Sequence, residues 1–383
     1  GRGLKTDILH AALINGISSH VFDFDDTHPD TLVHPSGPVA SAVLALGEYL
    51  HASGPDLVNA FVVGVEVECR VARAVLPAHY DVGWHITGTA GIFGAAAASA
   101  RLLGLSEAQT TWALGLAATQ AAGLREMFGS MAKSLHPGRA AQNGLSSALL
   151  AQADFTSADT GLEGVRGFAH VMSTSVDLSR ALDGLGSGYE LLRNTYKPFA
   201  CGLVVHPVID ACIQLRDEAG VKADQVDCIV LEVHPLVLEL TAKADPRSGL
   251  EGKFSVFHAA AAALLDGAGG QAQFTDERVN SPDIVALRGK VQAQAVSGME
   301  IDAANVKIVL RDGTSRQRNV AHCVGSGGQP MSDRQLEDKF RALCSPVIGA
   351  SQAEAALTVL RGLEDLDDVQ ACASALAGPA VGG

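Results

Sequence analysis

The chain has 383 residues, 47% of them hydrophobic, which is enough apolar material for two domains. Its formal net charge of −14 argues against nucleic acid or an anionic membrane as a partner, because both require a positively charged face. There is no apolar run of the ~20 residues that a membrane span needs, and no signal segment, so we expect a soluble protein of the cytoplasm or an organelle matrix.

Up to about residue 180 the sequence predicts helix after helix, rich in Ala, Leu and Gly. We expect helices at residues 10–20, 38–50, 55–76, 91–103, 106–123 and 139–153. The first two enclose a polar segment, residues 23–28 (Asp-Phe-Asp-Asp-Thr-His), which His34-Pro35-Ser36-Gly37 follows closely. We interpret this segment as a loop between two buried helices, and loops on rigid elements commonly carry catalytic groups.

The pattern changes after residue 180. We expect strands at residues 226–233, 306–310 and 315–320, with residues 311–314 (Arg-Asp-Gly-Thr) as a hairpin turn between the last two. Helices at 207–218 and 255–265 make this segment α+β.

A glycine-rich link at residues 325–328 then leads to a helix start, where Ser332 is the cap and Gln335 the N3 residue. Helical periodicity at 351–363 and 366–376 predicts that the tail returns to the first domain.

Three histidines stand close to predicted helix starts, namely His34, His85 and His136. A helix N-terminus attracts anions, so these imidazoles and Lys133 would suit a carboxylate ligand and supply proton-transfer groups. The alternative is that each His is a cap or a satisfied core residue, which is the commoner role of an isolated His.

A metal site is the other interpretation of the acidic segment, since Asp23, Asp25, Asp26 and His28 have suitable donor atoms. Their spacing matches neither DDxxD nor HExxH, and the seven cysteines show no CxxC pair, so we expect no metal. Asp23 and Asp26 would instead be helix-end acids or partners of a His. No Walker loop and no GxGxxG after a strand is present, and we expect no cofactor.

Six motifs in order along the chain resemble the MmgE/PrpD family: residues 23–27, 34–37, 83–85, 131–138, 197–199 and 253–255. The resemblance covers essentially the whole chain. It implies a mainly α protein with a large all-helical domain, residues 1–190 plus 325–383, completed by the C-terminal helices. A smaller α+β lid domain would occupy residues 191–324. It also implies a homodimer that uses neither metal nor organic cofactor.

Carried over by motif, the resemblance assigns two groups of site residues. The catalytic residues would be His34, His85, Lys133 and Asp23, and the substrate-binding residues would be Thr27, His136, Lys197 and Lys253. One of His34 and His85 would act as base and the other as acid, while Lys133 and Lys197 bind substrate carboxylates.

Members of this family include 2-methylcitrate dehydratase, cis-aconitate decarboxylase and iminodisuccinate epimerase, which act on small di- or tricarboxylates. The decarboxylase branch has a His five residues after the lid lysine, where this chain has Gly202, with His206 slightly later. We therefore expect a cofactor-independent dehydratase of a 2-methylcitrate-like hydroxy-polycarboxylate. Its alternatives are an epimerase of an imino- or amino-dicarboxylate and a cis-aconitate-type decarboxylase. An inactive carboxylate-binding homologue is also open, because family members have further helices ahead of the position of Gly1.

Overall fold

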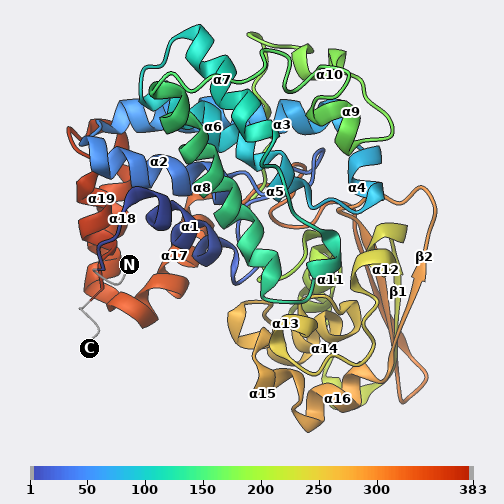
Figure 1. Ribbon diagram of the computed structural model, residues 1–383. Coiled ribbons are helices and arrows are strands. Elements are labelled where there is room, and N and C mark those ends of the chain that lie inside the picture. The colour runs from blue at the N-terminus through green and yellow to red at the C-terminus, as the bar shows by residue number, and fades with distance from the viewer. Residues whose placement is uncertain (1–3, 379–383) are drawn as a thin grey trace. The chain divides into compact units, whose positions relative to one another are not determined.

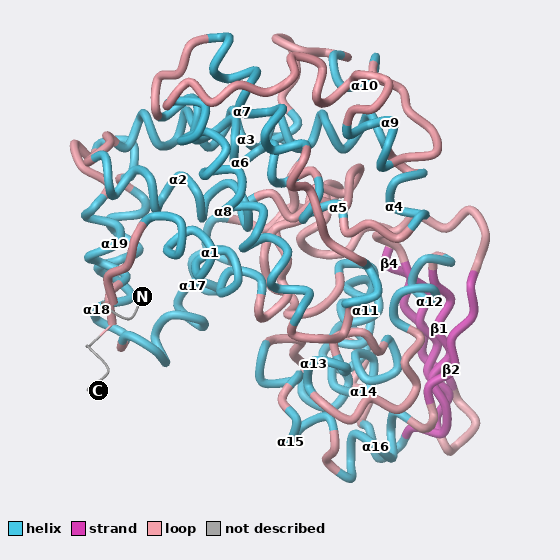
Figure 2. The backbone as a smooth tube through the Cα atoms, in the orientation of Figure 1, coloured by secondary structure: helices cyan, strands magenta, loops and turns pink. Residues whose placement is uncertain are grey.

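The computed structural model describes residues 4–378, which form two compact units (Figures 1 and 2). Unit 1 contains residues 4–21, Asp25–Asn194 and 332–378, and unit 2 contains Phe22–Phe24 and Thr195–Met331. Three residues of unit 2 thus interrupt the beginning of unit 1.

Unit 1 is helical. Its α-helices are α1 (Ile8–His20), α2 (Ser36–Leu50), α3 (Gly54–Val75), α4 (Ala78–Val82), α5 (Ile86–Thr89), α6 (Gly91–Leu102), α7 (Glu107–Ala118), α8 (Ala132–Gln152), α9 (Phe168–Met172), α10 (Ser179–Leu182), α17 (Asp333–Ile348), α18 (Ala350–Arg361) and α19 (Gln370–Leu376). Short 3₁₀ helices are η1 (Arg125–Met127), η2 (Glu190–Arg193) and η6 (Leu363–Asp365).

Helix α6 is the centre of unit 1, and its residues from Gly91 to Ala100 are all buried. A helix that is apolar and small-sided on every face has to be surrounded, and α2, α3, α7 and α8 pack around it. Glycines allow two of these approaches. A Cβ at Gly64 would lie 2.8 Å from the backbone oxygen of Gly94, and one at Gly144 would lie 2.5 Å from Cβ of Ala95.

A glycine pair also brings α1 against α8. A Cβ at Gly16 would lie 2.6 Å from Cα of Gly138, a distance that real side chains do not occupy. The two backbones therefore touch, and His20 follows Gly16 by about one helical turn while His136 precedes Gly138 by two residues. This contact places two imidazoles of the candidate site close to the crossing of the two helices.

The C-terminal helices return to unit 1, as predicted, and Figure 1 shows α19 beside α2. The backbone N–H of Gly54 donates to the oxygen of Leu366, and Val369 packs among residues of α2 and α3. The predicted cap is also confirmed, because Ser332 and Gln335 form a reciprocal capping box at the start of α17.

Unit 2 is α+β. Its strands are β1 (Val226–Val233), β2 (Val291–Ala295), β3 (Ala304–Leu310) and β4 (Ser315–Val320). Its α-helices are α11 (His206–Asp217), α12 (Pro235–Thr241), α13 (Gly249–Gly252), α14 (Val256–Asp266), α15 (Asp276–Val279) and α16 (Pro282–Arg288), with 3₁₀ helices η3 (Leu203–Val205), η4 (Ala223–Gln225) and η5 (Gln271–Phe274).

The four strands form one mixed sheet in the order β2-β1-β3-β4. β1 pairs in parallel with β2, where Ile229 faces Val291, and antiparallel with β3, where Ile229 faces Ile308. β3 and β4 form the predicted hairpin, whose turn uses Gly313 at a φ of 84°. Helices α11 and α14 supply the apolar side chains that cover the sheet.

The predicted fold class is confirmed, since the described residues are mainly helical with one small mixed sheet. Two details differ. Strand β2 was not predicted, and α8 begins at Ala132 rather than Arg139, so His136 and Pro137 lie inside the helix and not before it. Among the described helices there is none with both the length and the apolar character needed to cross a membrane.

Candidate active site

His34 lies in the loop between α1 and α2, and the hydrogen bonds of its Nδ1 atom fix the orientation of the ring. Nδ1 is 2.9 Å from the backbone oxygen of Asp26 and 3.1 Å from Oγ1 of Thr27. A carbonyl oxygen only accepts hydrogen bonds, so Nδ1 donates its proton and Nε2 carries the lone pair of the neutral ring. The backbone N–H of His34 donates to Oγ1 of Thr87 in α5, which ties the loop to that helix.

His20, the last residue of α1, is a site residue that the sequence motifs did not indicate. Its ring is buried, and Nδ1 lies 2.6 Å from Oδ2 of Asp25. A carboxylate orients the ring by accepting the Nδ1 proton, which leaves the lone pair on Nε2. That Nε2 atom is buried and has no hydrogen-bond partner among residues 4–378.

The two neighbouring acids have different surroundings. Asp25 approaches both imidazoles, because its Oδ1 atom is also 3.7 Å from Nδ1 of His34. Asp26 points to the start of α2 and accepts hydrogen bonds from the N–H and Oγ of Ser36 and from Nδ2 of Asn194. Burial, and then the charge of Asp25, raises the pKa of Asp26. Asp26 is thus the helix-end acid, and Asp25 is the acid that contacts the histidines.

His85 stands at the N-cap position of α5 without a side-chain capping bond, and it forms a close pair with His136 of α8, with 2.7 Å between their Nδ1 atoms. Burial, followed by the charge of Lys133, lowers the pKa of His85 well below its ordinary 6.5. Burial also lowers the pKa of His136 to about 4. Both rings are therefore neutral near pH 7 and can accept a proton.

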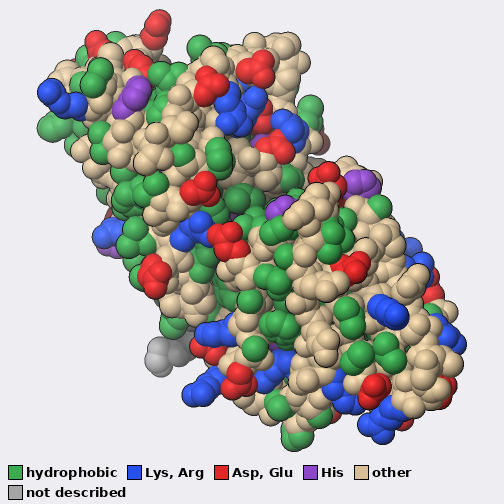
Figure 3. Space-filling model, turned by 90° about the vertical axis from the view of Figure 1, so that its right-hand side faces the viewer, with side chains coloured by type: hydrophobic (Ala, Val, Ile, Leu, Met, Phe, Trp, Pro, Cys, Tyr) green, Lys and Arg blue, Asp and Glu red, His purple; other side chains and the backbone are tan. Residues whose placement is uncertain are grey.

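Lys133 stands in the first turn of α8 with its Nζ 5.2 Å from the ring centroid of Phe128. The same phenyl ring packs edge-to-face against His85 at 5.0 Å. Charged side chains stand in scattered groups on the face in Figure 3, whereas Lys133, Lys197 and Lys253 are buried, at 7%, 1% and 2% exposed. Lysine is rarely buried unless it is paired, so these three are not ordinary surface lysines.

In unit 2, Lys197 and Asp23 form a buried ion pair. Nζ of Lys197 donates to Oδ1 of Asp23 at 2.9 Å and to its backbone oxygen at 3.2 Å. Asp23 has a φ of 49°, in the left-handed region, so the lysine holds both the side chain and an unusual backbone conformation of this residue.

Lys253 holds the same short segment of unit 2. Its ammonium donates to the backbone oxygens of Phe22 and Ala200 and to Oε1 of Gln271. These contacts fix the lysine to that segment, and its predicted role in substrate binding stays a prediction.

The structure therefore separates the predicted site residues into two groups. Unit 1 brings Thr27, His34, His85, Lys133 and His136 together with the unpredicted His20 and Asp25. Asp23, Lys197 and Lys253 belong to unit 2. His206, the first residue of α11, is buried there and packs edge-to-face on Phe199.

Two sets of donor atoms within unit 1 have the spacing of metal ligands: His20, His34 and His85, and separately His28, Asp30 and Glu190. In the second set Arg193 contacts Asp30, and Arg73 contacts Glu190. Arginine already supplies the positive charge there, whereas the first set consists of imidazoles alone.

The family model of the MmgE/PrpD N-terminal domain matches residues 1–181, and that of the C-terminal domain matches residues 199–365. The chain belongs to the MmgE/PrpD family. This MmgE/PrpD protein is similar to cis-aconitate decarboxylase of Homo sapiens, with 31% identity over 388 residues, 97% of this chain and 79% of the human protein. The mouse protein of the same name is 31% identical over 392 residues. That of Aspergillus terreus is 27% identical over 400 residues, 96% of this chain and 81% of the fungal protein.

Proposed function

We propose that this MmgE/PrpD protein is a lyase that decarboxylates a small unsaturated tricarboxylate of the cis-aconitate type by proton transfer from histidine. The observation that carries the proposal is the buried imidazole group of unit 1, in which Asp25 contacts His20 and His34 while Lys133 stands near His85. The names of the relatives support the choice of substrate.

The chemistry of such a substrate requires a proton donor and a cation. One alkene carbon gains a proton while the bond from the neighbouring methylene carbon to its carboxylate breaks, and the electrons of that bond form the new double bond as carbon dioxide leaves. Preorganised charges stabilise the charge that develops in this step. His34 is the proposed donor, because the carboxylate of Asp25 balances the charge of its protonated ring. Lys133 would bind a carboxylate that stays on the substrate.

A second candidate, the predicted dehydration of a 2-methylcitrate-like acid, is favoured by one observation. Gly202 stands where the decarboxylase branch of the family has a His. Dehydration needs a base for a proton next to a carboxylate and an acid for the leaving hydroxyl. Burial lowers the pKa of His85 and keeps its ring neutral near pH 7, so it would be the base, and His34 would be the acid.

Proton NMR in deuterium oxide, with EDTA present, tests both candidates on cis-aconitate and 2-methylcitrate. New vinylic methylene signals from cis-aconitate, with release of carbon dioxide, would support the decarboxylase, and an unsaturated acid from 2-methylcitrate would support the dehydratase. Loss of an α-proton signal from an aspartate-type acid without a new double bond would instead identify an epimerase. Ligand-induced stabilisation without any product would identify a binding homologue.

Two sets of variants assign the chemistry. His34→Ala and Lys133→Ala should each reduce turnover at least about 100-fold in folded protein, and full activity in both would refute the site.

Gly202→His tests the choice between decarboxylation and dehydration. Gly202 has an ordinary negative φ, and a Cβ there would meet Lys253 O at 3.9 Å and Thr241 Cγ2 at 4.0 Å, so the backbone and the Cβ atom of a histidine are accommodated. The variant should raise decarboxylation relative to dehydration.

A further inference from the structure

We propose that the imidazoles of His20, His34 and His85 bind one divalent transition-metal ion of the Zn²⁺ or Co²⁺ type, and that the bound ion inhibits the enzyme. The binding site stands on geometry alone. The inhibition rests on the proposed function, because it assumes that these rings transfer protons.

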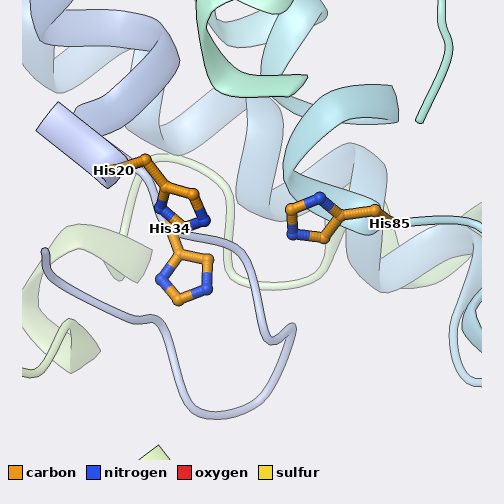
Figure 4. Close-up of side chains that lie close together, drawn as sticks. All are labelled: His20, His34 and His85. Carbon is orange, nitrogen blue, oxygen red and sulfur yellow. The ribbon is translucent and has the colours of Figure 1, made fainter. Parts of the chain in front are cut away.

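The three rings converge on one space from different elements (Figure 4). His20 comes from the end of α1, His34 from the following loop and His85 from the N-cap of α5. Their ring centroids are 4.8, 6.1 and 6.3 Å apart, and one nitrogen of each ring lies within 4.8 Å of the others. Nitrogens at that spacing lie about 2.8 Å from a common centre. Zinc–nitrogen bonds are about 2.0–2.1 Å, so each ring has to move by less than about 1 Å.

Hydrogen bonds leave the Nε2 lone pair available on two of the rings. Nδ1 of His20 is bound to the carboxylate of Asp25, and Nδ1 of His34 to the backbone oxygen of Asp26. A metal-binding His typically donates its other N–H to a carboxylate or carbonyl in this way, which orients the ring and increases its basicity. In both rings the lone pair is then on Nε2. For His20 that atom is fully buried and has no hydrogen-bond partner among residues 4–378, so a ligand would satisfy it.

The chemistry of the donors selects the class of ion. Three imidazoles suit Zn²⁺, Co²⁺ or Cu²⁺ rather than Mg²⁺ or Ca²⁺, which prefer oxygen. Asp25 supplies negative charge next to two of the ligands, which opposes the repulsion from Lys133 near His85. Three protein ligands leave a fourth position for water or a substrate carboxylate. An ion bound there occupies the lone pairs of the three rings, so none of them can exchange a proton with substrate.

Titration of the metal-free wild-type protein with Co²⁺, without substrate, tests the site. We expect one ion per chain, the visible bands of four- or five-coordinate cobalt, no thiolate charge-transfer band, and displacement by Zn²⁺. His20→Gln keeps an N–H for Asp25 but loses the imidazole, and His85→Gln removes another ligand. Each should weaken binding at least about 100-fold. His322→Gln is the matched control, because His322 is an exposed histidine paired with Asp302 at 2.8 Å and should leave binding unchanged.

X-ray absorption of the zinc-loaded wild-type protein gives a test that does not depend on folded variants. About three imidazole nitrogens at ~2.0 Å support the site, and sulfur at ~2.3 Å would place the ion at a cysteine and overturn it. Failure of folded wild-type protein to bind stoichiometric Co²⁺ would also overturn it, as would Co²⁺ binding in the two ligand variants that is as tight as in the wild-type protein. Turnover is measured separately, with EDTA present to remove metal, and tests the proposed function. Metal binding without turnover leaves the site standing and refutes the proposed function, whereas turnover that saturating Zn²⁺ does not reduce refutes the inhibition.

Discussion

Asp25 accepts a 2.6 Å hydrogen bond from Nδ1 of His20, and both side chains are buried. The pair joins the end of α1 to the loop that carries His34, whose own Nδ1 is 3.7 Å from the other oxygen of Asp25. One carboxylate therefore orients the ring of His20 by a hydrogen bond and places negative charge beside the ring of His34. Under the proposed function Asp25 is a positioning residue, since it would act on substrate through the imidazoles beside it.

Asp25→Asn should reduce kcat by about 10- to 100-fold with a smaller change in KM, because the amide no longer supplies the negative charge that orients His20 and lies beside His34. The pH profile of kcat should shift as well, which a purely structural defect would not produce. Steady-state kinetics across pH on the substrate found active by NMR gives both quantities. Asp30→Asn, a change at a half-exposed acid paired with Arg193, is the control. Equal kinetics in the two variants would contradict the role of Asp25.

The buried pair of Lys197 and Asp23 makes a prediction about stability. Lys197→Met leaves the carboxylate of Asp23 without this cation and should lower the free energy of unfolding by about 3–5 kcal/mol. The double variant with Asp23→Asn should recover part of that loss, because the buried charge is removed and Asn tolerates the left-handed φ of 49°. Urea unfolding of the wild-type protein, both single variants and the double variant gives the coupling energy.

Lys243→Met provides the comparison for this cycle, since Lys243 and Glu251 form a largely exposed pair in the same unit. The Lys243→Met variant should lose no more than about 1 kcal/mol of the free energy of unfolding. A Lys197→Met protein as stable as this control would show that the buried pair contributes nothing.

Local sequence signals were sufficient where a few neighbouring residues determine the structure. β-branched residues predicted β1 to its observed bounds, and Ser332 with Gln335 predicted the start of α17. Strand β2 gave no such signal, because the Val291–Ala295 segment is small and polar and mostly faces solvent. It becomes a strand through its parallel pairing with β1.

The sequence likewise predicted some residues of the candidate site and missed others. His34 and His85 stand in motifs, whereas His20 is the end of an ordinary helix and gains its place when the loop brings Asp25 back to it. Its spacing of five residues before Asp25 is the one available signal. The Pro137 pattern misled the expectation for His136, because a proline is typical of a first helical turn but here lies inside α8.

Buried histidines predict a loss of stability in acid. Burial lowers the pKa of His79 to about 4. Its Nδ1 atom contacts the backbone oxygen of Met172, and its Nε2 atom contacts Oγ1 of Thr89. A lowered pKa in the folded state gives stability that is full above pH 6.5 and is lost as the pH falls toward 4. The loss is about 3 kcal/mol for this residue alone. Urea unfolding at pH 7.5, 6 and 5 should show a shallower fall for His79→Gln than for the wild-type protein, and parallel curves would contradict it.

Glu68 of α3 predicts the opposite dependence on pH. Its carboxyl group is fully buried, and neither oxygen has a hydrogen-bond partner among residues 4–378. Burial, and then the charge of Asp26, raises its pKa well above 4.5. A raised pKa gives stability that is full below pH 4.5 and is lost as the pH rises through the folded-state value, by about 1.4 kcal/mol for each unit of difference.

Glu68→Gln keeps the shape of the side chain but cannot ionise. The variant should match the wild-type protein near pH 4 and exceed its free energy of unfolding at pH 8, by at least about 1 kcal/mol. Urea unfolding at the two pH values measures the difference. Glu48→Gln, at an exposed position of α2, should leave the pH dependence of the wild-type protein unchanged. If Glu68→Gln is less stable than the wild-type protein at pH 8, the ionised carboxylate is stabilised there by a group that the fold supplies, and Glu68 is not the neutral buried acid inferred from its surroundings.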